Sequence, residues 1–214
     1  MDLFQESTDW AKALAPLIKK YKDQKHPLDY QNIYQLLVMV VLSAQDSDKH
    51  INELAPELFK KFPTLKSLTK ADKSTLEPLI GKVRFFDNKA GWLLEIAATV
   101  QEDKNIPLTM SGLTALKGIG RKSANVIIRE AGVPPEGIMV DLHVVRVAPR
   151  LGIAKSKEAN KIEKELMQAL PKRMWQEIGM AMSFLGRDIC RPTHPKHELC
   201  PVKEHCAFCQ GKRQ

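Results

Sequence analysis

The chain has 214 residues and a formal charge of +8, because 33 Lys and Arg residues outnumber 25 Asp and Glu residues. This length can bury one large core or two small ones. The positive charge indicates an anionic partner without locating it. The longest apolar run, residues 36–42, is too short for a membrane span, and the first residues do not form a secretion signal. We therefore expect a soluble, intracellular protein with no membrane partner.

Apolar residues recur at helical spacing in the first half of the chain, and no run alternates as a strand does. The first helix begins with Trp10 and is expected to end near Tyr21. Residues 33–42 are apolar nearly all round, which predicts a central buried helix, and residues 43–48 end it and cap the next. Helices over about 51–59, 71–83 and 88–100 follow, with a short turn at residues 65–68. Their short connections predict a compact bundle of antiparallel helices.

Residues 113–127 predict a helix, a tight hairpin and a second helix that begins at Arg121. Gly118 and Gly120 permit positive φ and a close approach to the backbone. The amides of the hairpin and of the following helix start would point outward beside Arg121 and Lys122, which predicts a site for a nucleic-acid backbone. The simpler interpretation is an αα-hairpin with a glycine turn and a solvated Arg-Lys pair.

The strongest break in the chain is Gly-Val-Pro-Pro-Glu-Gly at residues 132–137. Residues 139–147 have a strand-like composition, but they also present one apolar helix face, with Asp141 as the N-cap. We predict a helix here because no other segment supplies a partner strand. Further helices are expected over about 162–170, ending at Pro171, and over 175–185.

Lys122 and Asp141 are the candidate catalytic residues. Lys122 falls in the first turn after the hairpin, where a lysine amine beside a DNA backbone can act as a nucleophile. Asp141 follows the break and can accept a proton or stabilise positive charge on a sugar. Each also has a simpler interpretation, as a phosphate-binding lysine and a helix-capping aspartate.

All the cysteines lie close to the C-terminal end of the chain, at Cys190, Cys200, Cys206 and Cys209. Disulfides are disfavoured in a reducing compartment. The close spacing of these thiols therefore predicts one metal site.

Several separated motifs carry a resemblance to a known family. They are Leu-Lys-Gly-Ile-Gly-Arg-Lys-Ser-Ala-Asn-Val at 116–126, Val-Asp-Leu-His-Val at 140–144 with the arginines that follow to residue 152, Leu-Ser-Ala-Gln at 42–45 with Asp48, Lys89-Ala90, and Gly186-Arg187 before Cys190. In this order they resemble the endonuclease III family of helix-hairpin-helix DNA glycosylases. The resemblance covers roughly residues 28–206.

The resemblance implies an all-α fold of two helical domains with a DNA cleft between them. Residues 28–136 would form a six-helix barrel that carries the helix-hairpin-helix at about 109–128. Residues 1–27 and 137–214 would form a terminal domain with a cysteine loop at 190–209. A monomer that binds double-stranded damaged DNA is expected, in the cytoplasm with the nucleoid, or in the nucleus or an organelle of a eukaryote.

The resemblance also implies a bifunctional DNA glycosylase/AP lyase that removes oxidised pyrimidines in base excision repair. Lys122 matches the nucleophile that forms a Schiff base and nicks the strand by β-elimination, and Asp141 matches the carboxylate that activates it. Gln45 matches the glutamine that enters the duplex where the damaged nucleotide is flipped out. The other expected DNA contacts are Gly118, Gly120, Arg121, Ser123, Arg84 and His143. Two alternatives stay open: a monofunctional helix-hairpin-helix glycosylase for a mispaired or alkylated base, and a non-catalytic DNA-binding module.

The family's 4Fe–4S cluster is the implied cofactor, but the cysteines here depart from the family's usual spacing of Cys-x6-Cys-x2-Cys-x5-Cys. Counted from Cys190, His197 occupies the second ligand position, and Cys200 and Cys206 match the third and fourth. Cys209 is then an addition. We favour four cysteine ligands over three cysteines with His197, since thiolate is the normal cluster ligand. Structural zinc is the remaining alternative.

Two further departures concern the substrate. Arg84 stands where relatives usually have a glycine, in a loop expected to wedge into DNA. Asp46 puts a carboxylate beside Gln45. Both are consistent with an altered lesion preference and equally with surface variation.

Overall fold

The computed structural model describes residues 8–211. Every regular element within this range is a helix, which confirms the all-α prediction. Within the same range, no helix is both long enough and apolar enough to cross a membrane. The chain divides into two compact units: one contains the chain up to Gln24 and from Gly137 onward, and the other contains Lys25–Glu136.

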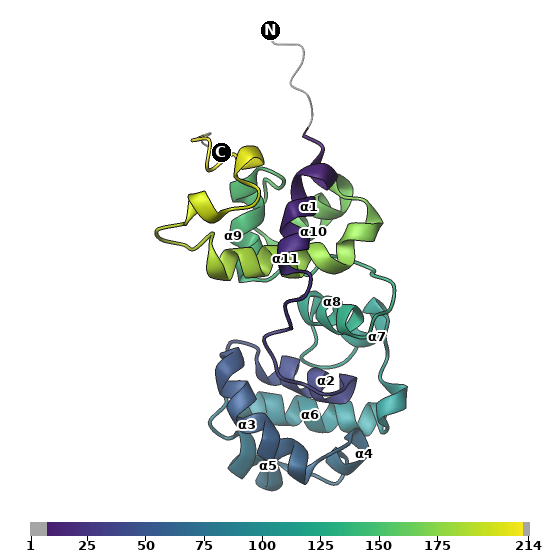
Figure 1. Cartoon of the computed structure of the whole chain (residues 1–214). Coiled ribbons are helices and arrows are strands. Elements are labelled where there is room, and N and C mark those ends of the chain that lie inside the picture. The colour runs from purple at the N-terminus through teal and green to yellow at the C-terminus, as the bar shows by residue number, and fades with distance from the viewer. Residues whose placement is uncertain (1–7, 212–214) are drawn as a thin grey trace. The chain divides into compact units, whose positions relative to one another are not determined.

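The unit formed by Lys25–Glu136 is built around one apolar helix (Figure 1). This helix, α2, packs against α3, α6 and α8, and its residues 36–42 are buried. The prediction of a central helix is confirmed, because a segment that is apolar all round is stable only when other helices cover it. The helices of this unit are α2 (Ile33–Leu42), α3 (Asp48–Lys61), α4 (Leu65–Leu68), α5 (Lys73–Ile80), α6 (Phe86–Val100), α7 (Met110–Thr114) and α8 (Arg121–Glu130).

Most predicted helix ends of this unit are also present. The side chain of Ser47 accepts a hydrogen bond from the His50 amide and caps α3, and that of Thr109 accepts from Gly112 and caps α7. The turn expected at residues 65–68 is instead the single-turn helix α4, because Thr64 and Ser67 form a capping box around it. The helix expected over 71–83 is shorter, since Asp72 caps α5 only at Lys73.

The hairpin between α7 and α8 requires glycine at its first position. Gly118 has a φ of +76°, and a Cβ atom placed there would lie 2.6 Å from the Trp92 ring. This one residue therefore combines a left-handed backbone with close packing against α6.

We expect Gly118→Ala to destabilise the protein by about 2–4 kcal/mol, because it adds left-handed strain to overpacking against Trp92. The urea midpoint of unfolding measures this effect. Gly91→Ala is the matched control, since a Cβ at Gly91 in the same helix as Trp92 meets nothing within 4 Å. It should stabilise by about 0.5–1 kcal/mol. Equal midpoints for the two variants would contradict the packing argument.

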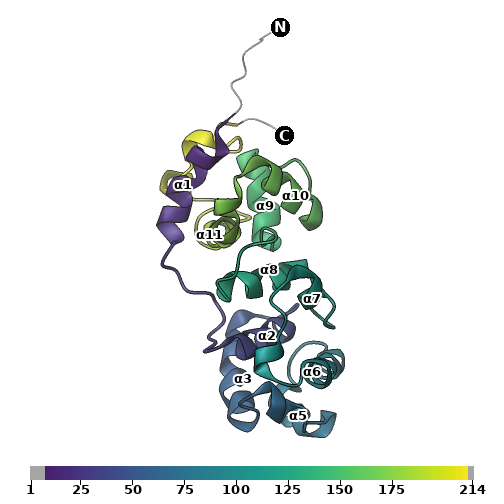
Figure 2. The same ribbon diagram turned by 90° about the vertical axis from the view of Figure 1, so that its right-hand side faces the viewer.

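The other unit is built around α11 (Trp175–Asp188), which packs against α1 (Trp10–Tyr21) and α9 (Leu142–Leu151) (Figure 2). The helix α10 (Ala159–Ala169) packs against α9. Segments from both ends of the chain thus share one core, in which Leu14, Leu17 and Ile178 are fully buried. Residues 142–151 are helical as predicted, with Asp141 as the N-cap.

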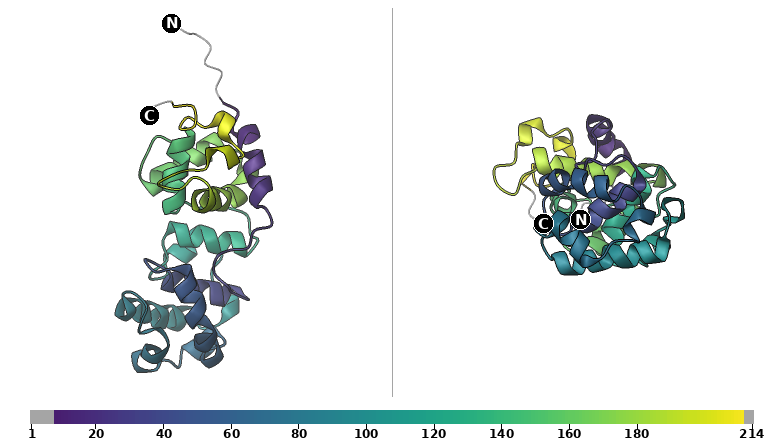
Figure 3. Two further views of the ribbon diagram at one scale, coloured as in Figure 1. Left: turned by 60° about the vertical axis from the view of Figure 1, so that its left-hand side comes forward. Right: turned by 90° about the horizontal axis from the view of Figure 1, so that it is seen from below.

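The segment that follows α11 carries the cysteines, and it is drawn in yellow within the same unit (Figure 3). It contains two short 3-10 helices, His197–Leu199 and Lys203–His205. Its end is held to α9, since the amides of Ala207 and Phe208 donate to the carbonyls of Leu151 and Arg150 at 3.0 and 2.9 Å.

Candidate active site and cysteine pocket

Lys122 is the second residue of α8, and its side chain is exposed. Gly120 is the N-cap of this helix and supplies no side-chain hydrogen bond to it. The start of α8 therefore has no carboxylate or hydroxyl cap of its own, and the helix dipole there favours an anion. Gly118, Gly120, Arg121 and Ser123 lie on the same hairpin, as the sequence predicted for this segment.

His26 is an ionisable neighbour of Lys122 that the sequence analysis treated only as part of a connector. Its ring stacks edge-on near Tyr30, and its Nδ1 accepts a hydrogen bond from the Leu28 amide at 3.1 Å. Burial lowers the pKa of His26; Glu130 and Asp48 oppose this shift, and Lys122 adds to it. A neutral imidazole thus lies within electrostatic range of the candidate nucleophile.

Asp141 is held by three hydrogen bonds in the unit that contains α9 and α11. Its Oδ1 accepts from the amides of His143 and Val144, both at 2.9 Å, and its Oδ2 accepts from the hydroxyl of Ser183 at 2.6 Å. Ser183 is a buried residue of α11. Ser183 was not among the predicted site residues, although a lone hydroxyl among the apolar residues 178–185 was a usable signal. The carboxylate is therefore fixed from two helices.

Lys122 and Asp141 belong to different units of the chain, and each is positioned by its own unit. His143 lies beside Asp141 in the first turn of α9. Gln45, Arg84 and the hairpin residues belong to the unit of Lys122.

The structure brings together two loops that the sequence treated separately. The Gln45 loop is residues 43–47, between α2 and α3, and the Phe85 loop is residues 81–85, between α5 and α6. Gln45 and Phe85 have left-handed backbones, with φ of +58° and +59°. The Arg84 amide donates to Asp46 Oδ2 at 3.0 Å and so joins the loops. Phe85, which the sequence analysis missed, is half exposed, and the Arg84 guanidinium lies 5.5 Å above its ring.

Asp46 also binds within its own loop, where its Oδ1 accepts from the Ser47 amide at 2.8 Å and lies 2.9 Å from His50 Nδ1. Burial acts to raise the pKa of Asp46, but the hydrogen bonds from Arg84, His50 and Ser47 outweigh it and lower this pKa to about 2. The carboxylate is therefore ionised at neutral pH.

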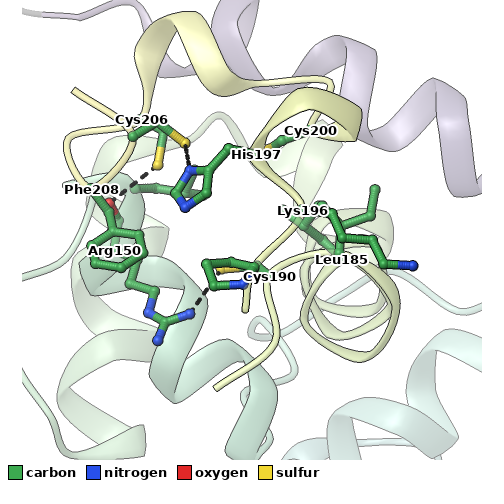
Figure 4. Close-up of a pocket in the computed structure, with 12 residues that line it drawn as sticks. Arg150, Leu185, Cys190, Lys196, His197, Cys200, Cys206 and Phe208 are labelled. Carbon is green, nitrogen blue, oxygen red and sulfur yellow. Dashed lines mark hydrogen bonds between the residues drawn. The ribbon is translucent and has the colours of Figure 1, made fainter. Parts of the chain in front are cut away.

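The four cysteines line one pocket between α9, α11 and the C-terminal segment (Figure 4). His197 shares this pocket, and its Nδ1 lies 2.6 Å from Cys209 Sγ. The apolar wall is formed by Leu151, Leu185 and Ile189. The loop that carries Cys190 is fixed by α9, because Arg146 Nε donates to the Cys190 carbonyl at 3.1 Å and Arg150 donates to the Arg191 carbonyl at 2.7 Å.

The four thiols that line this pocket are the usual ligand type of an iron–sulfur cluster. Burial, with the neighbouring Cys206, Cys200 and Cys190, raises the pKa of Cys209 to about 12. Burial likewise raises the pKa of Cys200. A thiol whose pKa is raised in this way needs a positive centre to become a thiolate. Among residues 8–211, no three His, Cys, Asp or Glu side chains are arranged so that they could hold a metal ion. The support for the predicted ligand set is that all four cysteines line the same pocket.

The sequence and the fold together define a class of DNA repair protein. Residues 38–172 match the model of the HhH-GPD superfamily of base excision DNA repair proteins. The chain belongs to this superfamily and, within it, to the Endonuclease III family. It is a DNA glycosylase/AP lyase of base excision repair.

Individual relatives agree with this assignment. The chain is 34% identical to Endonuclease III of Synechocystis sp. over 197 residues, which cover 91% of this chain and 90% of the relative. It is similar, at 31% identity and a TM-score of 0.84, to a trapped covalent intermediate of Endonuclease III with DNA, over 97% of this chain and 100% of that one. A thermostable thymine-DNA glycosylase shares the fold alone, with a TM-score of 0.81 at 17% identity over 95% of this chain and 97% of that one.

Proposed function

We propose that this enzyme binds double-stranded damaged DNA, removes oxidised pyrimidines through a Schiff base on Lys122, and nicks the strand by β-elimination. The observation that carries the proposal is an exposed lysine in the first turn of α8, directly after the Gly118–Gly120 hairpin. A lysine separates glycosylase/lyases from relatives that only remove bases, which favours this function over a monofunctional glycosylase.

The proposed reaction begins when the damaged nucleotide leaves the base stack, at a cost that is lowest for a poorly stacked lesion. The Lys122 amine attacks the sugar C1′; the N–C1′ bond forms, and the glycosidic bond breaks with its electron pair leaving on the base. The developing positive charge on the sugar is stabilised by the Asp141 carboxylate, which also accepts the proton from the amine.

The second half of the reaction uses the iminium that joins Lys122 to C1′. It forms when the nitrogen lone pair expels the ring oxygen: the C1′–O4′ bond breaks, its electron pair goes to O4′, and O4′ takes up a proton. The iminium makes the C2′ proton acidic; when that proton is removed, the 3′ phosphate leaves with its electron pair and the strand is cut. Hydrolysis then releases Lys122. The same iminium accepts a hydride from borohydride, which turns it into a stable amine and traps the complex.

Borohydride trapping of the wild-type enzyme on three duplexes tests the proposal. The duplexes carry an abasic site, a thymine glycol or a mismatch. A covalent adduct with the first two is the expected result. Base release from the thymine glycol or mismatched duplex without trapping would support a monofunctional glycosylase. Binding without any reaction would support a non-catalytic module.

We also propose that the cysteine pocket holds a 4Fe–4S cluster, as the Endonuclease III family generally does. Cys190, Cys200, Cys206 and Cys209 are the proposed ligands, and the cluster would brace the C-terminal segment against α9. We further expect a monomer that acts in the compartment that holds the chromosome, the cytoplasm in a bacterium.

We expect Cys209→Ser to lose most of the absorbance near about 400 nm and most of the bound iron, because it removes one of four thiolates. His197→Ala should keep both signals, although it removes the hydrogen-bond partner of Cys209. Visible spectra and iron assays of the purified proteins make this comparison. The opposite pattern would assign the fourth position to His197, and a colourless protein that contains zinc would contradict the cluster.

A further inference from the structure

Asp46 lies at the junction of two loops whose backbones are both strained. Gln45 and Phe85 each occupy the left-handed region that non-glycine residues rarely adopt. Such residues persist only where neighbouring contacts hold them, and they concentrate at functional sites. Here the bond from the Arg84 amide to Asp46 lies one residue from each strained position.

Both carboxylate oxygens of Asp46 make hydrogen bonds. One oxygen accepts from the Ser47 amide and contacts His50 in the Gln45 loop and α3, and the other accepts from the Arg84 amide. The Asp46 side chain is only 12% exposed, so water does not readily replace these donors. An asparagine at this position could present an oxygen to only one of the two loops.

A buried lysine makes a further contact at the junction of these two loops. Lys89 of α6 is 1% exposed, and its Nζ donates to the carbonyl of Leu42, the last residue of α2, at 2.7 Å. Asp46 and Arg84 both lie within electrostatic range of Lys89. The start of the Gln45 loop is thus fixed to α6 by Lys89, and its middle to the Phe85 loop by Asp46.

We propose that Asp46 is a positioning residue that holds the Gln45 loop and the Phe85 loop together as one preassembled surface. This surface would contact the bases around a lesion in the DNA. This inference rests on the proposed function. The exposed side chains on that surface are an amide, a guanidinium and a half-exposed aromatic ring. Such groups hydrogen-bond to base edges and stack on unpaired bases. Asp46 itself contacts protein groups and acts through its neighbours.

Preassembly reduces the cost of ordering two loops when DNA binds. It should therefore strengthen binding at a lesion, where a base is missing from the stack. It should not affect binding to intact duplex, which depends on backbone contacts elsewhere. The reaction rate of a fully bound abasic site should also change little, because Lys122 lies on a different helix start.

Asp46→Asn tests the proposal with Asp87→Asn as the matched control. Asp87 lies in the first turn of α6, beside the same loop, and its side chain is 80% exposed. Both variants remove one negative charge, so the general electrostatic effect on DNA affinity is the same. The affinity for a duplex with a tetrahydrofuran abasic analogue is measured against the affinity for the undamaged duplex.

For Asp46→Asn we expect this lesion discrimination to fall about fivefold to tenfold, the factor that one net hydrogen bond is worth. The trapping rate at saturating enzyme on a true abasic site should stay within about threefold of wild type. Fluorescence of 2-aminopurine opposite the analogue should report weaker unstacking. Discrimination and fluorescence equal to those of Asp87→Asn would overturn the proposal.

A double-mutant cycle with Phe85→Ala separates positioning from general destabilisation. If Asp46 acts through the Phe85 loop, the two losses of discrimination will be less than additive in the double variant. Additive losses would overturn the proposal even if Asp46→Asn were less stable. A wild-type enzyme that neither traps an abasic site nor discriminates the analogue would instead refute the proposed function.

Discussion

Lys122→Ala is expected to abolish borohydride trapping on an abasic duplex. The Lys122 amine nitrogen is the atom that bonds to C1′ in the proposed reaction. The alanine side chain has no amine, so it cannot form the iminium that borohydride reduces. We expect the single-turnover rate of strand cleavage to fall by at least about 1,000-fold, as for the loss of a covalent nucleophile. Gel separation of the cross-linked species from free DNA measures the adduct.

The variant should still bind DNA, which separates a chemical defect from a binding defect. The hairpin backbone around Gly118 and Gly120 is unchanged in this variant. Affinity for the abasic analogue should therefore fall by less than about tenfold, which is the contribution of one lysine charge near a DNA phosphate. Lys70→Ala is the matched control, because Lys70 is an exposed lysine of the same unit that is not part of the hairpin or of α8. It should trap like wild type.

One outcome would require a different nucleophile. If Lys122→Ala still formed an adduct at a wild-type rate, another amine of the chain would carry the reaction. Peptide mapping of that adduct would then identify it. Loss of trapping together with retained base release would show that Lys122 serves only the lyase step.

Asp141→Asn is expected to reduce the single-turnover trapping rate by about 100-fold to 10,000-fold, the usual contribution of a general acid or base. The substitution removes the charge that would stabilise the cationic sugar and the site that would accept the proton. It leaves the local fold in place, because Asn is as good an N-cap as Asp. The Asn Oδ1 can still accept from the amides of His143 and Val144, as Asp141 does.

Two controls separate the charge of Asp141 from its surroundings. Ser183→Ala removes the hydrogen bond to Oδ2 but keeps the carboxylate, so its rate should fall by less than about tenfold. Glu158→Gln removes an exposed negative charge of the same unit that is paired with Lys161, and it should react like wild type. A rate for Asp141→Asn within threefold of wild type would reduce Asp141 to a helix cap.

Local physical rules fixed a large part of this protein in advance. The ends of α1, α2 and the start of α8 were predicted at the observed residues, because apolar spacing and capping residues act within one helix. The role of Asp141 as N-cap was likewise a local property. Family membership followed from motifs that occur in a fixed order along the chain.

Contacts between residues far apart in the chain were decided only by the tertiary structure. Ser183 meets Asp141 across 42 positions, and the Arg84 amide meets Asp46 across 38. At such separations, the spacing of two residues in the sequence does not indicate how far apart they lie in space. Phe85 escaped detection because its left-handed backbone and exposure depend on the loop and not on its residue type.

The cysteines show the same division. Their clustering in the chain predicted one site, and they do line one pocket. The sequence could not show that His197 would contact Cys209, nor that Arg146 and Arg150 of α9 would fix the Cys190 loop. The sequence by itself determined most of the helices, the family and the candidate lysine, since these depend on neighbours in the chain. Tertiary packing decided which side chains surround each candidate, because that depends on how the helices of each unit fold against one another.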